Sequence, residues 1–193
     1  MFRVRATLVA LVASAMLLAG CGGGEDDSAD PATVPASPAG TGAVPPTGVP
    51  SDPPAGTSVP ETLAFTAPTV EGGELDGASL AGAPVVFWFW AAWCPRCAAA
   101  AEGVRDVATE YDGRVHTVGV AGLGSGVDGM RQFVDQHELD GFPHLADDEG
   151  EVWQKFGVTT QEYFVVLDAE GAIVHDGPLS ATELRDQLGE LVG

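Results

Sequence analysis

The sequence predicts an α/β layered fold for residues 61–193, and three observations support this prediction. Short apolar runs typical of buried strands alternate along the chain with segments whose apolar residues recur at helical spacing. The last expected elements are a β-hairpin and a helix. The residues before Glu61 show neither the helical spacing nor the pattern of buried strands, and they are rich in glycine, alanine and proline. Together these patterns favour helices packed on a central sheet.

The first strand is expected at residues 84–90, where a proline is followed by an unbroken run of valine, phenylalanine and tryptophan. Such a run is typical of a strand buried on both faces. The chain then enters a helix, which we expect to end at Asp112-Gly113 because glycine favours helix termination. Its apolar positions recur at helical spacing: Val104, Val107, Ala108 and Tyr111.

A second strand and a second helix are expected in the middle of the domain. Val115, Val118 and Val120 indicate a strand at residues 115–120, and the glycine-rich residues 122–126 end it. Residues 127–134 then carry their apolar side chains on one helical face.

The end of the chain predicts a hairpin and a last helix. Residues 163–167 form another apolar run, and the turn at residues 169–171 leads into a second strand at residues 172–174. The final helix is expected to begin at Ser180, because Glu183 follows at the spacing of a capping box.

The first 20 residues predict a lipoprotein signal peptide. Arg3 and Arg5 flank an apolar run at residues 6–18, shorter than the roughly 20 residues that a spanning helix needs. The run ends in Leu-Ala-Gly-Cys, which resembles a bacterial lipobox, so cleavage before Cys21 and lipidation of its thiol are expected. We therefore expect an extracytoplasmic protein that is lipid-anchored to the cell membrane.

Residues 21–60 are expected to form a disordered tether between this lipidated cysteine and one domain at residues 61–193. The tether contains too little apolar surface to offset the entropy of ordering the chain. The whole chain has Lys+Arg 8 against Asp+Glu 28, a net charge of -20, which excludes binding to nucleic acid phosphates.

The sequence Cys-Pro-Arg-Cys at positions 94–97 lies where the buried strand gives way to the helix. This spacing brings two thiols onto one face, close enough to form a disulfide. Cys94 is expected to be exposed at the helix N-terminus, where backbone N–H groups stabilise the reactive thiolate. Arg96 adds positive charge, Pro95 suits the first helical turn, and Cys97 is the expected resolving thiol.

Other chemistries fit these cysteines poorly. A structural zinc site needs about four ligands, and the expected domain has no second cysteine pair. A c-type haem would need a histidine after Cys97, where Ala98 stands. A purely structural disulfide would close too small a loop to stabilise the fold much. The histidines are scattered singly and predict no metal site: His116, His137, His144 and His175.

Residues 88–97, from Trp88 through Trp93 to Cys97, resemble the active-site strand and helix of the thioredoxin-like TlpA and DsbE families, especially the secreted DsbE-like proteins of mycobacteria. The resemblance extends over residues 63–193. It implies a thioredoxin-like fold with a central mixed sheet flanked by helices. It also implies exchange with thiols and disulfides of exported proteins, no cofactor beyond the redox-active disulfide, and a membrane redox partner that resets the pair.

Three positions depart from this family. Where relatives carry a cis-proline before the last buried strand, alignment places Glu162, so we expect a trans peptide bond and a reshaped loop. A carboxylate at Glu162 is expected to raise the pKa of Cys94, in opposition to Arg96. Relatives often carry a glutamate and then a proline where this chain has Ala100 and Glu102. Trp93, Pro95, Arg96 and Glu162 are thus the residues expected to tune the pair.

The direction of the reaction follows from Trp88, which stands where thioredoxin-type reductants hold a buried aspartate. Without that base, Cys97 loses its proton less readily, and a stabilised Cys94 thiolate makes the disulfide oxidising. The sequence therefore favours an oxidase. The alternatives are a reductase of the TlpA type, for instance in cytochrome c maturation, and a degenerate binding module with weak redox activity. A peroxide-reducing relative would need a peroxidatic Thr/Cys arrangement that the sequence lacks.

Overall fold

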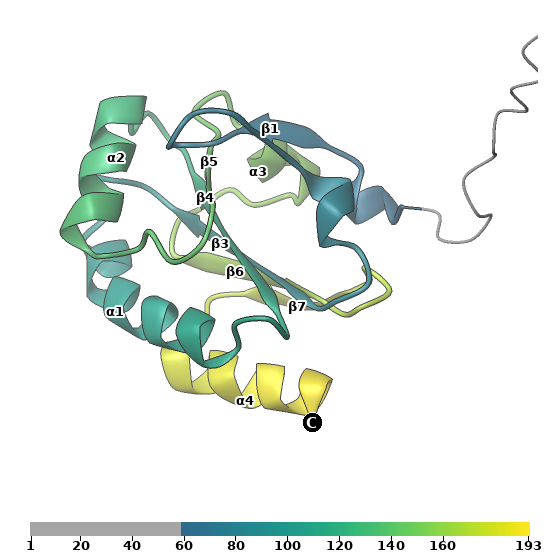
Figure 1. The fold of residues 1–193 in the computed structure, drawn as a ribbon. Helices are drawn as coiled ribbons and strands as arrows, with labels where there is room; N and C mark the ends of the chain where they lie inside the picture. Colours follow the sequence, from purple (N-terminus) through teal and green to yellow (C-terminus); the bar gives the residue numbers. More distant parts are fainter. Residues whose placement is uncertain (1–58) are drawn as a thin grey trace, which may run out of the picture. The chain divides into compact units, whose positions relative to one another are not determined.

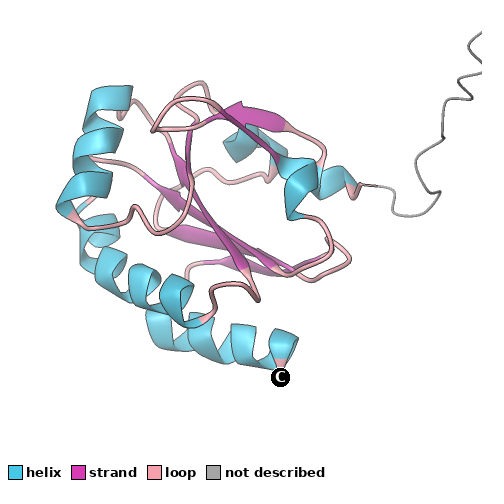
Figure 2. Ribbon diagram, viewed as in Figure 1, coloured by secondary structure: helices cyan, strands magenta, loops and turns pink. Residues whose placement is uncertain are grey.

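A mixed sheet of five strands, in the order β5-β4-β3-β6-β7, is the centre of the computed structural model, which describes residues 59–193 (Figures 1 and 2). β3 pairs in parallel with β4, and β4 with β5, whereas β6 and β7 run antiparallel to their neighbours. The strands are β3 (Val85–Trp90), β4 (His116–Ala121), β5 (His144–Ala146), β6 (Tyr163–Leu167) and β7 (Ile173–Gly177).

Three helices cover one face of this sheet. They are α1 (Pro95–Glu110), α2 (Val127–Gln136) and α4 (Ala181–Val192). The other face carries α3 (Glu151–Lys155), the 3-10 turns Glu61–Leu63 and Gly77–Leu80, and the small hairpin of β1 (Thr66–Pro68) and β2 (Glu74–Asp76). The expected α/β fold with a mixed sheet and flanking helices is confirmed.

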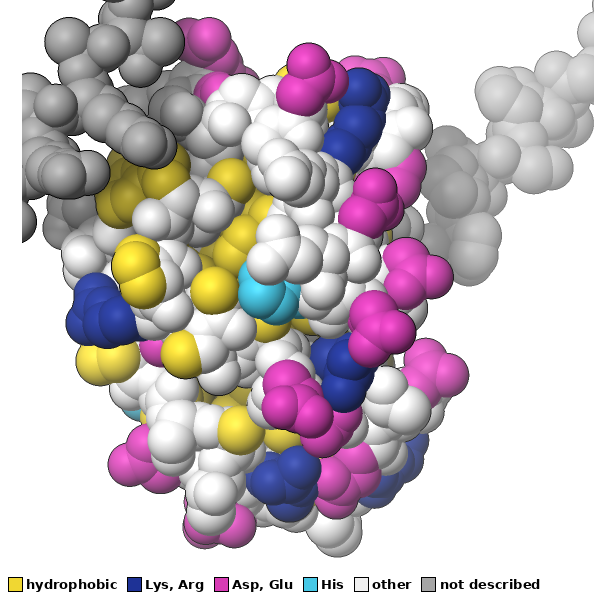
Figure 3. Space-filling model, turned by 90° about the vertical axis from the view of Figure 1, so that its left-hand side faces the viewer, with side chains coloured by type: hydrophobic (Ala, Val, Ile, Leu, Met, Phe, Trp, Pro, Cys, Tyr) yellow, Lys and Arg dark blue, Asp and Glu magenta, His cyan; other side chains and the backbone are white. Residues whose placement is uncertain are grey.

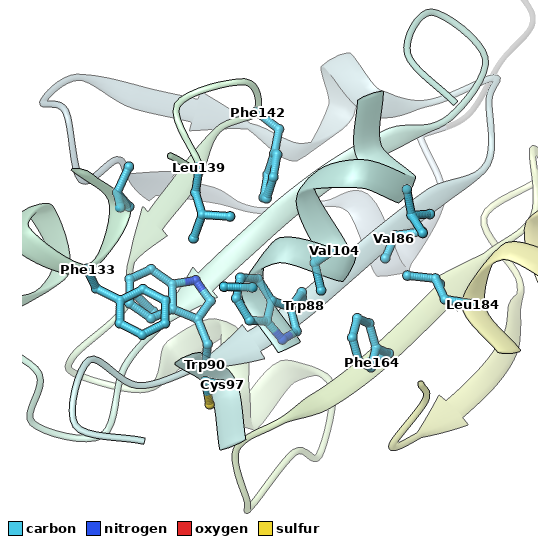
Figure 4. Close-up of a cluster of buried hydrophobic side chains, with 14 of the residues drawn as sticks. Val86, Trp88, Trp90, Cys97, Val104, Phe133, Leu139, Phe142, Phe164 and Leu184 are labelled. Atoms are coloured by element: carbon cyan, nitrogen blue, oxygen red, sulfur yellow. The ribbon is translucent and has the colours of Figure 1, made fainter. Parts of the chain in front are cut away.

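All six residues of β3 are buried, because the sheet has a hydrophobic core on each side. Trp88 and Trp90 face the core under α1 and α2, while Phe87 and Phe89 face the core under α3. Figure 4 shows the first of these cores, with Trp88 and Trp90 among side chains from the surrounding helices and Cys97 at its edge. The absence of polar residues from this strand follows from its two buried faces.

The predicted helices and the main strands are present, with small shifts at their ends. The hairpin of β6 and β7 and the capping box of Ser180 and Glu183 at the start of α4 are confirmed. The sequence did not predict β5, α3, or the hairpin of β1 and β2. Each of these elements has only three to five residues, too few to show a period.

The expected signal peptide at residues 1–20, the expected lipidation site Cys21 and nearly all of the expected tether lie outside the described residues. Among residues 59–193, no helix is long and apolar enough to cross a membrane.

His144 is a buried histidine on β5 whose ring is held neutral. Its Nε2 lies 3.0 Å from the Leu139 carbonyl, and burial lowers the pKa of His144 to about 4, although that bond raises it. The fit is tight: a Cβ at Gly119 would lie 2.0 Å from His144 Nδ1 and 2.8 Å from Trp90 Nε1. His144 therefore belongs to the core, consistent with its isolation in the sequence.

The lowered pKa of His144 predicts that the fold weakens in mild acid. Below about pH 6.5, the ordinary pKa, His144 of the unfolded chain is protonated, whereas His144 of the folded chain stays neutral down to about pH 4. Through His144, the free energy of unfolding should therefore fall by about 2 kcal/mol as the pH is lowered from about 7 to about 5. Urea unfolding at both pH values measures this loss, and His144→Gln should flatten it. An equal loss in the variant would contradict the assignment.

Candidate active site

The two cysteines lie at the junction between β3 and α1. Cys94 is the N-cap of α1, Pro95 occupies its first turn, and Cys97 lies one turn inside. The two sulfurs form a disulfide, with the Cα atoms 5.3 Å apart. The backbone N–H of Cys97 donates to Cys94 Sγ at 3.1 Å. β3 ends at Trp90 and Pro95 begins α1, so the short segment between them places the Cys94 sulfur at the N-terminus of the helix.

The burial of Cys94 differs from the sequence-based expectation. Cys94 was expected to be exposed, but only 2 % of its surface reaches solvent, and Cys97 is completely buried. The expectation was wrong because the disulfide draws the Cys94 side chain onto the same hydrophobic cluster as Trp88 and Trp90. The neighbouring Trp93 is 55 % exposed instead.

A loop after β4 supports the junction that carries the cysteines, through contacts that the sequence did not predict. Ser125 Oγ accepts the N–H of Ala92 at 2.9 Å, and the Trp93 indole donates to the Leu123 carbonyl at 2.9 Å. Asp148 in turn accepts the N–H groups of Ser125 and Gly126. The glycine-rich composition of residues 122–126 was the available signal, but contacts across 30 residues leave no local pattern.

Trp93 belongs to an exposed apolar patch that we define by Trp93, Leu123 and Val127, exposed by 55 %, 40 % and 42 %. Leu123 has a φ of 58°, in the left-handed region that few side chains adopt. Figure 3 views the molecule from the side of α2 and shows apolar side chains in the middle of this face, with acidic ones mainly along its right side and lower part. This face thus exposes apolar side chains although the chain has a net charge of -20.

Arg96 holds a second loop against the site. Its guanidinium donates to the carbonyl of Gln161 at 3.1 Å, so it fixes the peptide that precedes Glu162. From its charge alone, Arg96 was expected to act on Cys94 electrostatically. The structure adds a contact that ties α1 to the loop before β6.

Glu162 occupies that loop in a trans conformation, as expected: residues 59–193 contain no cis peptide bond, and Glu162 has a φ of 43°. Its side chain is partly buried, and burial raises the pKa of Glu162. The indole N–H of Trp88 and the positive charge of Arg96 act in the opposite direction. The indole nonetheless falls short of full hydrogen-bond geometry, and Oε1 has no partner within residues 59–193.

Trp88 and Ala100, the two positions where the family resemblance implies a carboxylate in other members, are both uncharged. Trp88 is completely buried on β3, opposite Phe164 on β6. Ala100, one turn after Cys97, lines a groove of about 400 Å³ together with Glu162. No cluster of three metal-ligating side chains occurs in the described part of the chain.

Comparison with known proteins places this geometry in a family. Residues 56–176 match the AhpC/TSA family. The chain belongs to this thioredoxin-like family. Soluble secreted antigen MPT53 of Mycobacterium tuberculosis is 38 % identical over 128 residues, 66 % of this chain and 72 % of that protein. Thiol-disulfide oxidoreductase ResA of Oceanobacillus iheyensis is 30 % identical over 118 residues, 58 % of this chain and 59 % of its own.

Solved structures agree with these relatives. Mycobacterium tuberculosis DsbF, in mixed oxidised and reduced forms, matches with a TM-score of 0.66 and 41 % identity over 69 % of this chain and 99 % of its own. A secreted disulfide oxidoreductase of the same organism, homologous to Escherichia coli DsbE, matches with a TM-score of 0.62 and 37 % identity over 68 % and 99 %. The expected thioredoxin-like fold and the resemblance to DsbE-like proteins are confirmed. This member of the AhpC/TSA family is a thiol–disulfide oxidoreductase.

Proposed function

We propose that this protein is an extracytoplasmic oxidase that forms disulfide bonds in exported proteins. A substrate thiolate attacks Cys94, the bond between Cys94 and Cys97 breaks, and Cys97 leaves with the electron pair and takes up a proton. A second substrate thiolate then attacks the substrate sulfur of the mixed disulfide and releases Cys94 as a thiolate. The substrate loses two electrons and becomes a disulfide, and the enzyme becomes a dithiol.

The observation that carries this direction is the environment of Cys94 Sγ. The N–H of Cys97 points to it at 3.1 Å, and the N–H of Arg96 lies in the same first turn of α1, whereas Pro95 has no N–H and the N–H of Ala98 donates to the Cys94 carbonyl. These groups stabilise a thiolate more than a disulfide sulfur. A stabilised reduced form makes the disulfide a stronger oxidant.

Trp88 supports the same direction. Resolution of a mixed disulfide by Cys97, which a reductase needs, requires Cys97 to lose a proton. Trp88 provides no base on the strand beneath it. Pro95 in the first turn and Trp93 beside Cys94 are further residues that we propose tune the site, Trp93 through the apolar patch that an unfolded substrate would contact.

The proposed location follows from the N-terminal sequence and the relatives. A signal peptide at residues 1–20, lipidation at Cys21 and a tether at residues 21–60 would hold the domain of residues 61–193 outside the cytoplasm. Both MPT53 and the DsbE homologue are described as secreted. A membrane redox partner that accepts two electrons would restore the disulfide.

Two other functions remain as alternatives. A reductase would use the same cysteines in the opposite direction, and the relative ResA supports only the general exchange chemistry. A binding module with weak redox activity would explain the replacement of the family proline by Glu162, but it gives no role to two paired thiols.

Oxidative refolding of a reduced, unfolded protein with several disulfides tests the proposal. The protein carries Cys21→Ser, so that of its 3 cysteines only the pair remains. We expect stoichiometric oxidation of the substrate by the disulfide form and none by the dithiol form. Transfer that runs only from the dithiol form to substrate disulfides would favour the reductase, and no transfer either way would favour the binding module.

A further inference from the structure

The two residues before Cys94 are bound to the loop that follows β4. The N–H of Ala92 donates to Ser125 Oγ at 2.9 Å, and the indole N–H of Trp93 donates to the Leu123 carbonyl at 2.9 Å. These partners lie 33 and 30 residues further along the chain, so the two bonds join segments that are distant in the sequence. The loop therefore fixes where the indole beside the reactive sulfur lies.

Asp148, which follows β5, holds this loop in turn. Its carboxylate oxygens accept the N–H groups of Ser125 and Gly126 at 3.0 and 2.8 Å. The Ser125 hydroxyl donates to the Gly122 carbonyl at 2.6 Å, which leaves the lone pairs of its oxygen free to accept the N–H of Ala92. A chain of hydrogen bonds thus runs from Asp148 through Ser125 to the turn that precedes α1.

Leu123 is the unfavourable residue of this loop. Its φ of 58° lies in the left-handed region, and its side chain is 40 % exposed. The neighbouring glycines Gly124 and Gly126 also have positive φ, but glycine adopts such a conformation without strain. A leucine that is both strained and exposed contributes little to the stability of the fold. Its side chain is therefore expected to serve a contact outside the folded domain.

The exposed apolar patch of Trp93, Leu123 and Val127 is continuous with the redox site. The first turn of α2 lies against the same segment, since a Cβ at Gly129 would lie 3.6 Å from that of Ala92. Because Trp93 directly precedes the attacked cysteine, a side chain next to the substrate cysteine comes within its reach when the two sulfurs join. Burial of an apolar side chain on such a patch is favourable.

We propose that Ser125 and Asp148 are positioning residues that hold Trp93 and Leu123 as a docking surface for an apolar side chain beside the substrate cysteine. The inference rests on the proposed disulfide exchange and names the substrates that it favours, which are unfolded segments with a leucine, valine or aromatic residue next to a cysteine. Because the indole and the leucine are already fixed, binding loses no free energy to ordering them. Ser125 and Asp148 act only through these two side chains.

Two reduced peptides test this docking surface. Each has two cysteines, flanked by leucine in one peptide and by serine in the other, and each is mixed with the disulfide form of the Cys21→Ser protein. Mass spectrometry of acid-quenched samples gives the second-order rate constants. The leucine peptide should react about tenfold faster than the serine peptide. Reaction of both peptides with oxidised glutathione gives the ratio of rates without the docking surface.

In Ser125→Ala the ratio of the two rates should fall to about two, mainly through the leucine peptide, because Ala92 loses its partner and Trp93 is no longer fixed. Ser125→Thr keeps the hydroxyl and should restore most of the ratio. Asp148→Asn keeps one acceptor oxygen and should lower the ratio only part of the way.

Leu123→Gly separates docking from folding. Glycine relieves the strain at a φ of 58° and also removes the apolar side chain. The variant should therefore keep its midpoint of urea unfolding while the ratio of the two rates falls to about two. A residue with a merely structural role would not lower the ratio at unchanged stability.

The matched control is Ser79→Ala. The Ser79 hydroxyl also donates at 2.6 Å to a carbonyl three residues earlier, but it belongs to the turn Gly77–Leu80 on the opposite face of the sheet. This variant should keep the tenfold ratio. An unchanged ratio in both Ser125→Ala and Leu123→Gly would overturn the proposal, and so would equal slowing of the two peptides.

The wild-type protein provides a further check that does not depend on any variant in the loop. A wild-type ratio equal to that with oxidised glutathione would overturn the docking surface while leaving disulfide exchange intact. Failure of the wild-type protein to oxidise either peptide would instead contradict the proposed function, and the inference with it.

Discussion

Replacement of Cys94 by serine is expected to reduce catalysed disulfide exchange by at least about 1000-fold, because the nucleophile is lost. Cys97→Ser should also lose turnover, but it should retain the first chemical step. With a peptide disulfide as substrate, Cys97→Ser should accumulate a mixed disulfide at Cys94, since no thiol remains to resolve it. Intact-protein mass spectrometry in the Cys21→Ser background detects this adduct.

The two serine variants are matched controls for each other. They remove the same atom on either side of the disulfide, so a general effect on folding would appear in both. Adduct formation in Cys94→Ser rather than in Cys97→Ser would reverse the proposed roles. Retention of more than about one tenth of the exchange rate in Cys94→Ser would contradict the mechanism.

Truncation of Trp90 to alanine is expected to lower the free energy of unfolding by about 3–5 kcal/mol. Trp90 is completely buried on β3, stacks on Phe133 of α2 with ring centroids 4.4 Å apart, and meets His144 edge-on. Its loss leaves a cavity between the sheet and α2 that the packed neighbours cannot fill. Urea unfolding of the purified variant measures the change.

Trp93→Ala is the control for this prediction, because it deletes the same side chain three residues away at a position that is 55 % exposed. We expect it to destabilise the fold by less than about 1 kcal/mol. If Trp93→Ala lowered the free energy of unfolding as much as Trp90→Ala does, burial on β3 would not explain the contribution of Trp90 to stability.

Local sequence patterns predicted the elements that build the core. β3 was recognisable because both of its faces are buried, and α4 because Ser180 and Glu183 form a capping box. The short β5 and α3 were missed because three to five residues are too few to show a period. The cap of α3 by Asp147 is a local contact, four to six residues along the chain, whereas β5 is held by its pairing with β4.

For the candidate site, the sequence predicted the disulfide between Cys94 and Cys97 but not the contacts around it. The Cys-Pro-Arg-Cys spacing identified the pair, and the alignment identified Glu162 as a departure from the family. The burial of Cys94 and the contact between Arg96 and Gln161 were not predicted, because they depend on how α1 meets a loop 65 residues away. The support of the site by Ser125 and Asp148 has the same origin.

The measurement that tests the central claim most directly is the reduction potential of the Cys94–Cys97 pair, taken by equilibration of the Cys21→Ser protein with glutathione. The stabilised Cys94 thiolate predicts an oxidising couple, nearer the roughly −120 mV of strong disulfide-forming oxidants than the roughly −270 mV of thioredoxin. A value near that of thioredoxin would contradict the oxidase and assign the protein to the reductases.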